Sequence, residues 1–284
     1  MDDLVSTGWL AQELSAPDLV VLDASSHLPM RGRDARAEFE GGHIPGARFL
    51  DLATLVDQDS DVPAAIPTAA QLAERLGSLG VSNDARVVLY DDSAVKTAAR
   101  AWFILRRYGV DVAILDGGLA KWTAEDRALE SGGVDAAPAS FSASDGTGSV
   151  ASRSDVLANT DSADRLVLDA RDAKRFSGAL PDFRPNVARG HIPGSANLPF
   201  DRVLNDDGTY KSHEELRAIL TEAGVDERPV TTTCGSGVTA SVLLFALHLA
   251  GRDDVALYDG SWGEWGADPA TPKSVTAQPE DAGA

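Results

Sequence analysis

The sequence predicts an α/β protein built from two tandem copies of one domain, each a parallel β-sheet flanked by helices. Three observations predict it: four motifs occur twice in the same order, short apolar runs alternate with amphipathic segments, and a stretch rich in Gly, Ser, Ala and Pro separates the two copies. The chain of 284 residues is long for one hydrophobic core and long enough for two.

Four motifs of the first half recur in the second half. The offset between the copies ranges from 142 residues, between Thr97 and Thr239, to 148 residues, between Gly41 and Arg189. The motif pairs are VVLDAS and LVLDAR, GGHIPGA and RGHIPGS, TAARAWFILRRYG and TASVLLFALHLAG, and VAILDGGLAKW and VALYDGSWGEW. A repeated order at nearly constant spacing indicates a duplicated domain.

Within the first copy, strand-like runs alternate with helix-like segments. Residues 19–23 (LVVLD), 86–90 (RVVLY) and 112–116 (VAILD) are short, apolar and partly β-branched, which is typical of strands buried on both faces. Residues 68–80 and 96–109 carry helical spacing and end at glycine, a common helix stop. This alternation predicts a parallel sheet, whose ligands bind at the carboxyl ends of the strands.

The domain boundaries follow from the repeats. We expect a first domain over residues 1–135, a linker over 136–150, a second domain over 151–268 and a flexible tail over 269–284. The linker region lacks periodicity, and the last residues of the chain have the composition of a loose terminus.

The composition excludes several function classes. With 44 acidic and 25 basic residues the formal charge is −19, which repels nucleic acid and anionic lipid surfaces. We expect no membrane segment, because no apolar run reaches the ~18 residues that a span requires, and no signal peptide, because the start lacks a basic region followed by an apolar one. A single cysteine cannot form an internal disulfide or a thiolate zinc site. We therefore expect a cytoplasmic protein without metal or nucleotide cofactor, since no phosphate-binding or metal-ligand spacing is found either.

The single cysteine, Cys234, follows the strand-like run RPVTTT (228–233) and precedes a helix-like segment over 239–251. A lone cysteine is often only a small buried apolar residue. Here Gly235 and Gly237 allow the loop to curl and to aim several backbone N–H groups at one point. Such groups and a helix N-terminus stabilise negative charge, and the thiolate is the nucleophilic form of cysteine. The pattern predicts a reactive cysteine.

The loop CGSGVTA (234–240), the paired HIPG motifs and the segments DGGLAKW and DGSWGEW resemble the tandem-domain rhodanese family of sulfurtransferases. The resemblance covers nearly the whole chain outside the linker and tail, and it implies two rhodanese folds, the second of which carries the nucleophile. It also implies that Cys234 takes a sulfur atom from a small anionic donor as a persulfide and passes it to cyanide or to a thiol such as that of thioredoxin. The rest of the loop would bind the substrate, through Gly235, Gly237, Val238 and Thr239.

Within the family, the CGSG form of the loop resembles the group that uses 3-mercaptopyruvate. In that group a serine at the position of Ser236 assists the cysteine, and two arginines, which match Arg175 and Arg184, bind the carboxylate of the donor. A guanidinium fork suits a planar carboxylate, and two forks would draw an anion into an acidic protein. The alternatives are thiosulfate as the donor, although thiosulfate-using relatives more often have basic residues after the cysteine, and a sulfur carrier or interaction module without catalysis.

Several positions depart from the pattern of this group. An ungapped reading places Ala53 and Ala64 where the group has an aspartate and a histidine from the first domain, and Ser26 where relatives have tryptophan. A phosphatase of the same fold would need an arginine six residues after its cysteine, where this chain has Ala240.

The first copy has no cysteine, and matching Thr97 to Thr239 places Asp92 at the position of Cys234. A carboxylate cannot carry a sulfane sulfur, so the first domain is predicted to be non-catalytic. The other conspicuous side chains are interpreted as follows: His43 and His191 hold a turn, Arg171 and Arg189 are structural, and Trp262 and Trp265 either line the mouth of the site or pack in the core.

Overall fold

The computed structural model describes residues 1–144 and 147–276, and these divide into two compact units. The first unit comprises residues 1–58, 66–147 (apart from 145 and 146) and 205–210. The second comprises residues 59–65, 148–204 and the described residues from 211 onward. Each unit holds one copy of the repeat, except that two short segments, 59–65 and 205–210, group with the opposite unit.

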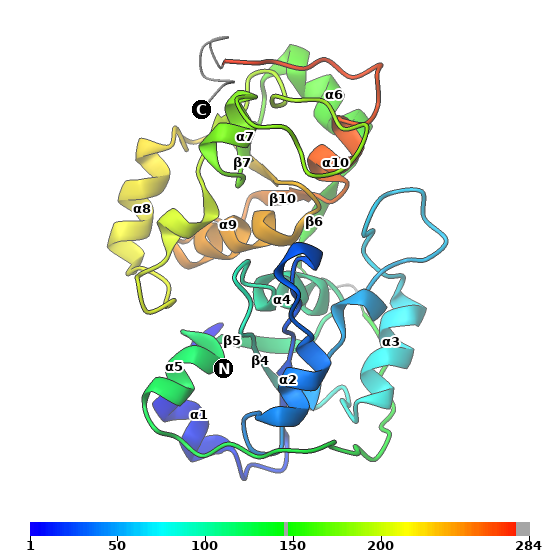
Figure 1. Ribbon diagram of the computed structural model, residues 1–284, viewed down its shortest axis with the longest axis vertical. Coiled ribbons are helices and arrows are strands. Elements are labelled where there is room, and N and C mark those ends of the chain that lie inside the picture. The colour runs from blue at the N-terminus through cyan, green and yellow to red at the C-terminus, as the bar shows by residue number, and fades with distance from the viewer. Residues whose placement is uncertain (145–146, 277–284) are drawn as a thin grey trace. The chain divides into compact units, whose positions relative to one another are not determined.

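The first unit contains a five-stranded sheet of order β1-β5-β4-β2-β3, in which every pairing is parallel. In Figure 1, α4 lies on one side of the β4–β5 part of this sheet and α1 and α5 lie on the other. The elements in chain order are β1 Leu4–Val5, α1 Thr7–Glu13, β2 Leu19–Asp23, η1 Pro29–Arg31, α2 Ala35–Gly41, β3 Arg48–Phe49, η2 Leu52–Thr54, α3 Ala69–Ser78, β4 Arg86–Tyr90, α4 Ala98–Arg107, β5 Asp111–Leu115 and α5 Gly118–Ala124.

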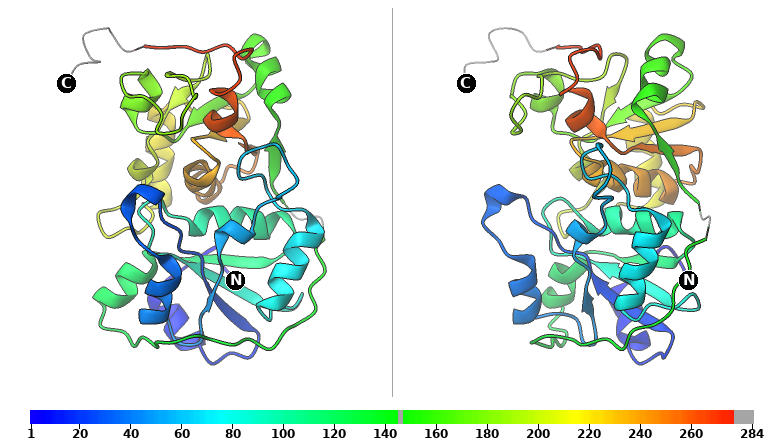
Figure 2. Two further views of the ribbon diagram at one scale, coloured as in Figure 1. Left: turned by 45° about the vertical axis from the view of Figure 1, so that its right-hand side comes forward. Right: turned by 90° about the vertical axis from the view of Figure 1, so that its right-hand side faces the viewer.

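The second unit repeats this topology, with the parallel strand order β6-β10-β9-β7-β8. Figure 2 shows the same unit from two further directions. Its elements are β6 Ser149–Ala151, α6 Arg153–Ser162, β7 Leu166–Asp169, α7 Ala173–Ser177, β8 Ala196–Asn197, η3 Phe200–Val203, α8 His213–Glu222, β9 Val230–Thr233, α9 Val238–Leu249, β10 Val255–Tyr258 and α10 Ser261–Trp265. The predicted α/β class with two parallel sheets flanked by helices is confirmed.

The burial of the elements explains why these residues fold as they do. In β2 and β4 every residue but the first is buried, and β7, β9 and β10 are buried throughout, as parallel strands between helical layers must be. Helix α9 buries every residue from Ala240 to Leu247, so its apolar character on all sides matches its place in the core. Helices α3, α6 and α8 begin with capping boxes, in which a Thr or Ser and a residue three positions later satisfy each other's backbone N–H groups.

The ends of the second copy are more ordered than the sequence predicts. Strand β6 begins at Ser149, inside the segment expected to be linker. In the predicted tail, the backbone of Ser274 makes two hydrogen bonds to His191, of 2.9 and 3.0 Å, and the Thr276 N–H donates to Ser177 over 3.0 Å. Up to residue 276 the predicted tail is thus attached to His191 of the HIPG turn and to Ser177, and the rest of the tail lies outside the described residues.

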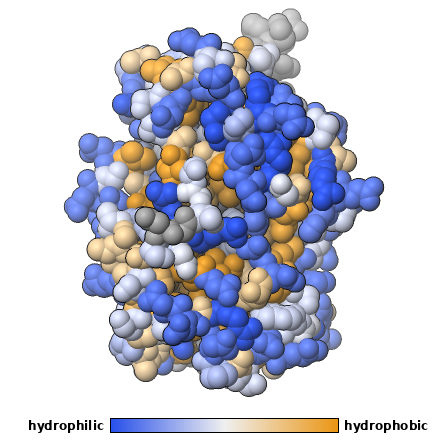
Figure 3. All heavy atoms as spheres, turned by 180° about the vertical axis from the view of Figure 1, so that it is seen from behind, coloured by the Kyte–Doolittle hydropathy of each residue, from blue (hydrophilic) through white to orange (hydrophobic). Residues whose placement is uncertain are grey.

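The surface reflects the acidic composition. Figure 3 shows one face on which hydrophilic residues predominate, with smaller apolar areas between them. Among the described residues, no helix combines the length and the apolar character that crossing a bilayer requires.

Candidate active site

Cys234 lies at the carboxyl end of β9, a central strand of the second sheet, which is where ligand sites of parallel sheets occur. Its side chain is only 2% exposed. The loop after it turns into α9 at Gly237, whose φ of 78° lies in the left-handed region that glycine adopts without strain. Val238 is the first residue of α9 and Thr239 the second. The structure therefore places Cys234 between the end of a buried strand and the start of a buried helix.

The hydroxyl of Ser261, at the start of α10, organises this loop. It accepts hydrogen bonds from the Cys234 N–H and the Gly237 N–H, each over 3.1 Å, and donates to the Tyr258 carbonyl over 2.8 Å. Ser261 is fully buried and has a φ of 51°, a left-handed conformation that is costly for a residue other than glycine. The hydroxyl compensates for this conformation by satisfying two buried N–H donors of the cysteine loop.

Two backbone hydrogen bonds complete the attachment of the loop to α10. The Trp262 N–H donates to the Cys234 carbonyl over 2.9 Å, and the Gly263 N–H donates to the Gly235 carbonyl over 3.0 Å. A Cβ atom on Gly263 would lie 2.8 Å from that same carbonyl oxygen, so only glycine fits there. Ser261 and Gly263 are not among the residues predicted from the sequence. The available signal was the motif pair DGGLAKW and DGSWGEW, in which the cysteine-bearing copy replaces one glycine by serine.

Replacing Ser261 by alanine is expected to destabilise the second unit by about 1–3 kcal/mol for each buried N–H donor left unsatisfied, and to lower the activity that depends on the loop. The matched control is Ser241→Ala, which removes another fully buried serine next to the loop whose hydroxyl donates to the Gly237 carbonyl over 2.7 Å. Thermal unfolding of both variants measures the difference. A Ser261→Ala protein as stable and active as Ser241→Ala would show that the hydroxyl does not organise the loop.

The sulfur atom of Cys234 is approached by backbone N–H rather than by apolar groups alone. The Ser236 N–H lies 3.5 Å from Sγ, and α9 starts two residues later. N–H dipoles and the N-terminus of a twelve-residue helix both favour negative charge at this point. The loop can thus hold an anion at or beyond Sγ.

Arg184 lies directly over the cysteine loop. A Cβ atom built on Gly235 would be 2.9 Å from its Nη2 and 3.2 Å from its Nη1, so the missing side chain of Gly235 makes room for the guanidinium. Arg184 is positioned by Asp182, whose carboxylate accepts from its Nη1 over 3.3 Å and whose side chain is 98% buried (2% exposed). The Arg184 side chain is 25% exposed, so it is accessible to a ligand.

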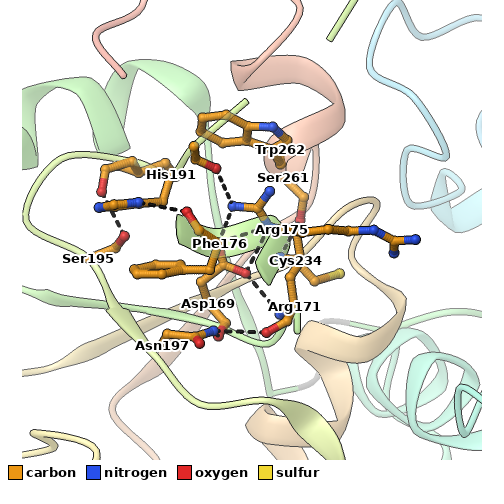
Figure 4. Close-up of polar contacts among 12 residues, drawn as sticks. Asp169, Arg171, Arg175, Phe176, His191, Ser195, Asn197, Cys234, Ser261 and Trp262 are labelled. Carbon is orange, nitrogen blue, oxygen red and sulfur yellow. Dashed lines mark hydrogen bonds and ion pairs between the residues drawn. The ribbon is translucent and has the colours of Figure 1, made fainter. Parts of the chain in front are cut away.

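Arg175, at α7, approaches the same region. Its guanidinium lies 5.3 Å from the ring centroid of Phe183, and that of Arg184 lies 4.5 Å from the same ring. Phe183 is exposed, and both predicted arginines lie over its ring. The spacing of the residues in the sequence could not show that the two arginines share this contact. In the view of Figure 4, the side chains of Arg175 and Cys234 project toward the same side.

Arg171, next to these residues in sequence, has a different role. It forms a buried ion pair with Asp169, with an Nη2–Oδ2 distance of 2.7 Å, and also donates to the Gly190 carbonyl over 2.8 Å (Figure 4). Its guanidinium lies 4.6 Å from the ring of Trp262. The structural interpretation of Arg171 is confirmed, since all these contacts hold the ends of β7 and the HIPG turn together. Arg189 is exposed and donates to the Ala179 carbonyl over 3.4 Å.

The two histidines of the HIPG motifs make the same contacts in each copy. His43 Nδ1 lies 2.8 Å from the Phe39 carbonyl and its ring stacks on Phe39 at 4.1 Å; His191 repeats this with Phe176 at 2.8 and 4.0 Å. A contact that occurs equally in the copy without cysteine supports the turn, as expected. Trp262 and Trp265 are 1% and 0% exposed and belong to the core of the second unit. Of the two interpretations offered for them, packing in the core is therefore the one that the structure supports.

The first unit carries Asp91, and not Asp92, at the position of Cys234. In the two sheets, Val87 pairs with Val112 as Val230 pairs with Val255, and counting along β4 and β9 from these pairs leads to Asp91 and Cys234. The expectation of Asp92 was wrong because the loop from Asp91 to the threonine before α4 is one residue longer than its counterpart, so matching backward from the threonine shifts the alignment by one.

In the first unit, the loop after β4 holds the side chain of Asp91 by backbone hydrogen bonds. Its Oδ1 accepts from the Ser93 N–H over 3.0 Å, and its Oδ2 accepts from the Ala98 N–H, at the start of α4, over 2.6 Å. Burial raises the pKa of this carboxyl above its ordinary value, while the two N–H groups act in the opposite direction. Asp92 instead pairs with Arg33, with an Oδ2–Nη2 distance of 2.6 Å. The loop thus directs two backbone N–H groups toward Asp91 in the first copy and the Ser236 N–H toward Cys234 in the second.

The two alanines that depart from the expected pattern offer no polar group. Ala53 lies in η2, and Ala64 is exposed with a φ of 55° in the segment 59–65. Within the described ranges, no group of three or more His, Cys, Asp or Glu side chains is arranged to hold a metal ion.

The comparisons of this chain with known protein families, sequences and structures agree with one another. The family model described as "Rhodanese-like domain" matches residues 6–125 and 152–268. The 3-mercaptopyruvate sulfurtransferase of Mus musculus is 43% identical over 270 residues, which cover 92% of this chain and 91% of that protein, and the thiosulfate sulfurtransferase of Cricetulus griseus is 40% identical over 273 residues, with the same coverage. The crystal structure of SseA, a 3-mercaptopyruvate sulfotransferase from Escherichia coli, superimposes with a TM-score of 0.83 and 37% identity, covering 92% of this chain and 99% of that one.

Proposed function

Because the chain belongs to the rhodanese family, with one rhodanese-like domain at residues 6–125 and another at 152–268, we propose that it is a sulfurtransferase that uses Cys234 as its nucleophile. The proposed donor is 3-mercaptopyruvate, and the acceptor is a thiol or cyanide. Sulfur is carried between them as a persulfide on Cys234. The proposal includes thioredoxin as a thiol acceptor and a reducing, cytoplasmic setting, in which a single buried thiol stays available.

In the first half-reaction, the Cys234 thiolate attacks the sulfur of 3-mercaptopyruvate. The S–S bond forms while the C–S bond of the donor breaks, and the electron pair of that bond passes to the methylene carbon as the enolate of pyruvate. In net terms the thiol hydrogen of the donor becomes the third methyl hydrogen of pyruvate. In the second half-reaction the acceptor attacks the outer sulfur and the Cys234 thiolate is regenerated, so that one transfer is divided into two covalent steps.

The observation that carries the proposal is the position of Sγ, which lies beside the Ser236 N–H and before the N-terminus of α9. The Ser236 N–H at 3.5 Å and the start of α9 supply positive dipoles where a persulfide anion would develop. The first unit supports this assignment, since its corresponding loop holds the Asp91 carboxylate by two such N–H groups, at 3.0 and 2.6 Å. The carboxylate oxygens of an aspartate lie two bonds beyond Cβ, as does the outer sulfur of a cysteine persulfide.

The donor is assigned from the charge and shape of its binding groups. Arg175 and Arg184 meet around Phe183, and Arg184 lies over the cysteine loop, so a carboxylate on the donor can be held while its sulfur faces Sγ. We assign Ser236 to assist the cysteine, and Gly235, Gly237, Val238 and Thr239 to surround the bound sulfur. Thiosulfate remains the second candidate donor. The thiosulfate sulfurtransferase of Cricetulus griseus is 40% identical to this chain, nearly as similar as the 3-mercaptopyruvate sulfurtransferase of Mus musculus at 43%.

The test is a comparison of kcat/KM for 3-mercaptopyruvate and for thiosulfate with one common acceptor. We expect the larger value for 3-mercaptopyruvate, because a planar carboxylate matches two guanidinium forks better than a tetrahedral sulfonate group does. A larger value for thiosulfate would reverse the donor assignment and leave the sulfurtransferase activity in place. An absence of turnover with both donors would favour a sulfur carrier or interaction module.

A further inference from the structure

A cavity of about 170 Å³ lies in the first unit. It is lined by residues of two segments, 27–33 and 93–95, and the lining residues are His27, Leu28, Arg31, Arg33, Ser93, Ala94 and Val95. Since roughly 10–15 Å³ of such space already admits one water molecule, the cavity can hold a compound of a few carbon atoms.

The cavity lies at the edge of the first sheet that corresponds to the edge carrying the catalytic loop in the second, although Asp91 itself does not line it. Its two segments follow β2 and β4, and the arginines 175 and 184 and the cysteine loop follow the corresponding strands β7 and β9. Ligands of parallel sheets bind at these carboxyl ends. Each unit therefore has a candidate binding place at this edge of its sheet. The first unit has no cysteine there, and its Asp91 is held by backbone N–H groups.

The two arginines that line the cavity differ in their ion pairs. Arg33 is held by two carboxylates, with its Nη2 2.8 Å from Glu38 and 2.6 Å from Asp92. His27 Nε2 also lies 2.8 Å from Glu38. Arg31, by contrast, is exposed and makes no ion pair with any residue that the structure describes. In a chain of net charge −19, an arginine that lines a cavity without a carboxylate partner can receive an external anion.

The remaining wall of the cavity is mostly apolar. Leu28, Ala94 and Val95 contribute hydrocarbon groups, and the Ser93 hydroxyl is already engaged, donating to the Ser26 carbonyl over 2.6 Å. A few polar groups in a largely apolar concave wall are typical of sites for small organic molecules. The wall favours an anion with a short apolar body over an inorganic oxyanion.

We propose that this cavity binds a small organic carboxylate reversibly, with its carboxylate on the Arg31 guanidinium and its short carbon body against Leu28, Ala94 and Val95. No bond is made or broken there. The residues that line this cavity all belong to the first unit, and the proposal does not depend on which donor the second unit uses.

The experiment is a titration of isotope-labelled full-length protein with pyruvate, followed by the backbone amide signals. Signals of Ser93–Val95 report on the first-unit cavity and signals of Gly235–Gly237 report on the catalytic loop. We expect pyruvate to shift the first set with a Kd in the millimolar range, and Arg31→Ala to weaken that binding at least about 10-fold, the loss of one charged hydrogen bond. The matched control is Arg36→Ala, which removes another exposed arginine of the same unit that lies 4.8 Å over the Phe49 ring.

Three results would overturn the proposal: no shift of Ser93–Val95 with pyruvate, equal binding in Arg31→Ala and wild type, or stronger binding of inorganic sulfate than of pyruvate. The last result would mean that the cavity takes an oxyanion without need of its apolar wall. Because the Gly235–Gly237 signals are read in the same titration, pyruvate bound at the catalytic loop is distinguished from pyruvate bound in the first-unit cavity. The donor assignment is tested independently by the comparison of kcat/KM values.

Discussion

Replacing Cys234 by serine is expected to abolish sulfur transfer, with kcat reduced by at least about 10³-fold, while the protein stays folded. A serine hydroxyl cannot carry a sulfane sulfur, so the covalent step is lost completely and not merely slowed. The exchange is nearly isosteric, and the loop around it is held by Ser261 and by backbone hydrogen bonds that do not involve the sulfur. Steady-state turnover with 3-mercaptopyruvate and a thermal unfolding curve measure the two parts of this prediction.

A Cys234→Ala variant separates the chemical role from any effect of the introduced hydroxyl. Both variants should be equally inactive and should unfold near the temperature of the wild type. Since the chain contains no other cysteine, no second thiol can replace the missing one. Turnover at the wild-type rate in either variant would remove Cys234 from the mechanism.

The second large effect is expected from the two arginines. Arg175→Ala and Arg184→Ala should each raise KM for 3-mercaptopyruvate roughly 10- to 150-fold, the value of one charged hydrogen bond of about 1.5–3 kcal/mol. The kcat value should change much less, because a carboxylate contact exists in both the ground state and the transition state. Steady-state kinetics over a wide range of donor concentration separates the two parameters.

Two further variants sharpen this prediction. Arg189→Ala is the matched control, because Arg189 is exposed in the same segment and contacts only the Ala179 carbonyl in the part of the chain that is described. Gly235→Ala keeps both charges but places a Cβ atom 2.9 Å from Arg184 Nη2, so it should raise KM by displacing the guanidinium. Wild-type KM values in both arginine variants would show that these residues do not bind the donor.

Much of the fold was readable from the sequence, because it depends on local patterns. The duplicated motifs fixed the number of domains, and the short apolar runs correctly indicated strands buried on both faces, such as 86–90 and 230–233. The position of Cys234 directly after such a run placed it at the carboxyl edge of the sheet. These inferences need only the order of residues along the chain and the rule that parallel strands share their carboxyl ends.

The parts that the sequence could not supply depend on contacts between distant segments. The hydroxyl of Ser261 reaches the Cys234 N–H across 27 positions of sequence, and Phe183 meets both arginines only because the segment after β7 folds back on itself. The wrong prediction of Asp92, in place of Asp91, as the counterpart of Cys234 has a different cause. One extra residue in a loop changes an alignment made from the helix side but not one made from the strand side, and only the strand register distinguishes the two.

The most direct test is mass spectrometry of the intact wild-type protein after incubation with 3-mercaptopyruvate and without acceptor. We expect the mass to rise by one sulfur atom, the added sulfur to map to the peptide that contains Cys234, and the increase to disappear when a thiol acceptor is added. An unchanged mass under conditions in which the same preparation turns over, or a sulfur atom mapped to any other residue, would contradict a persulfide on Cys234.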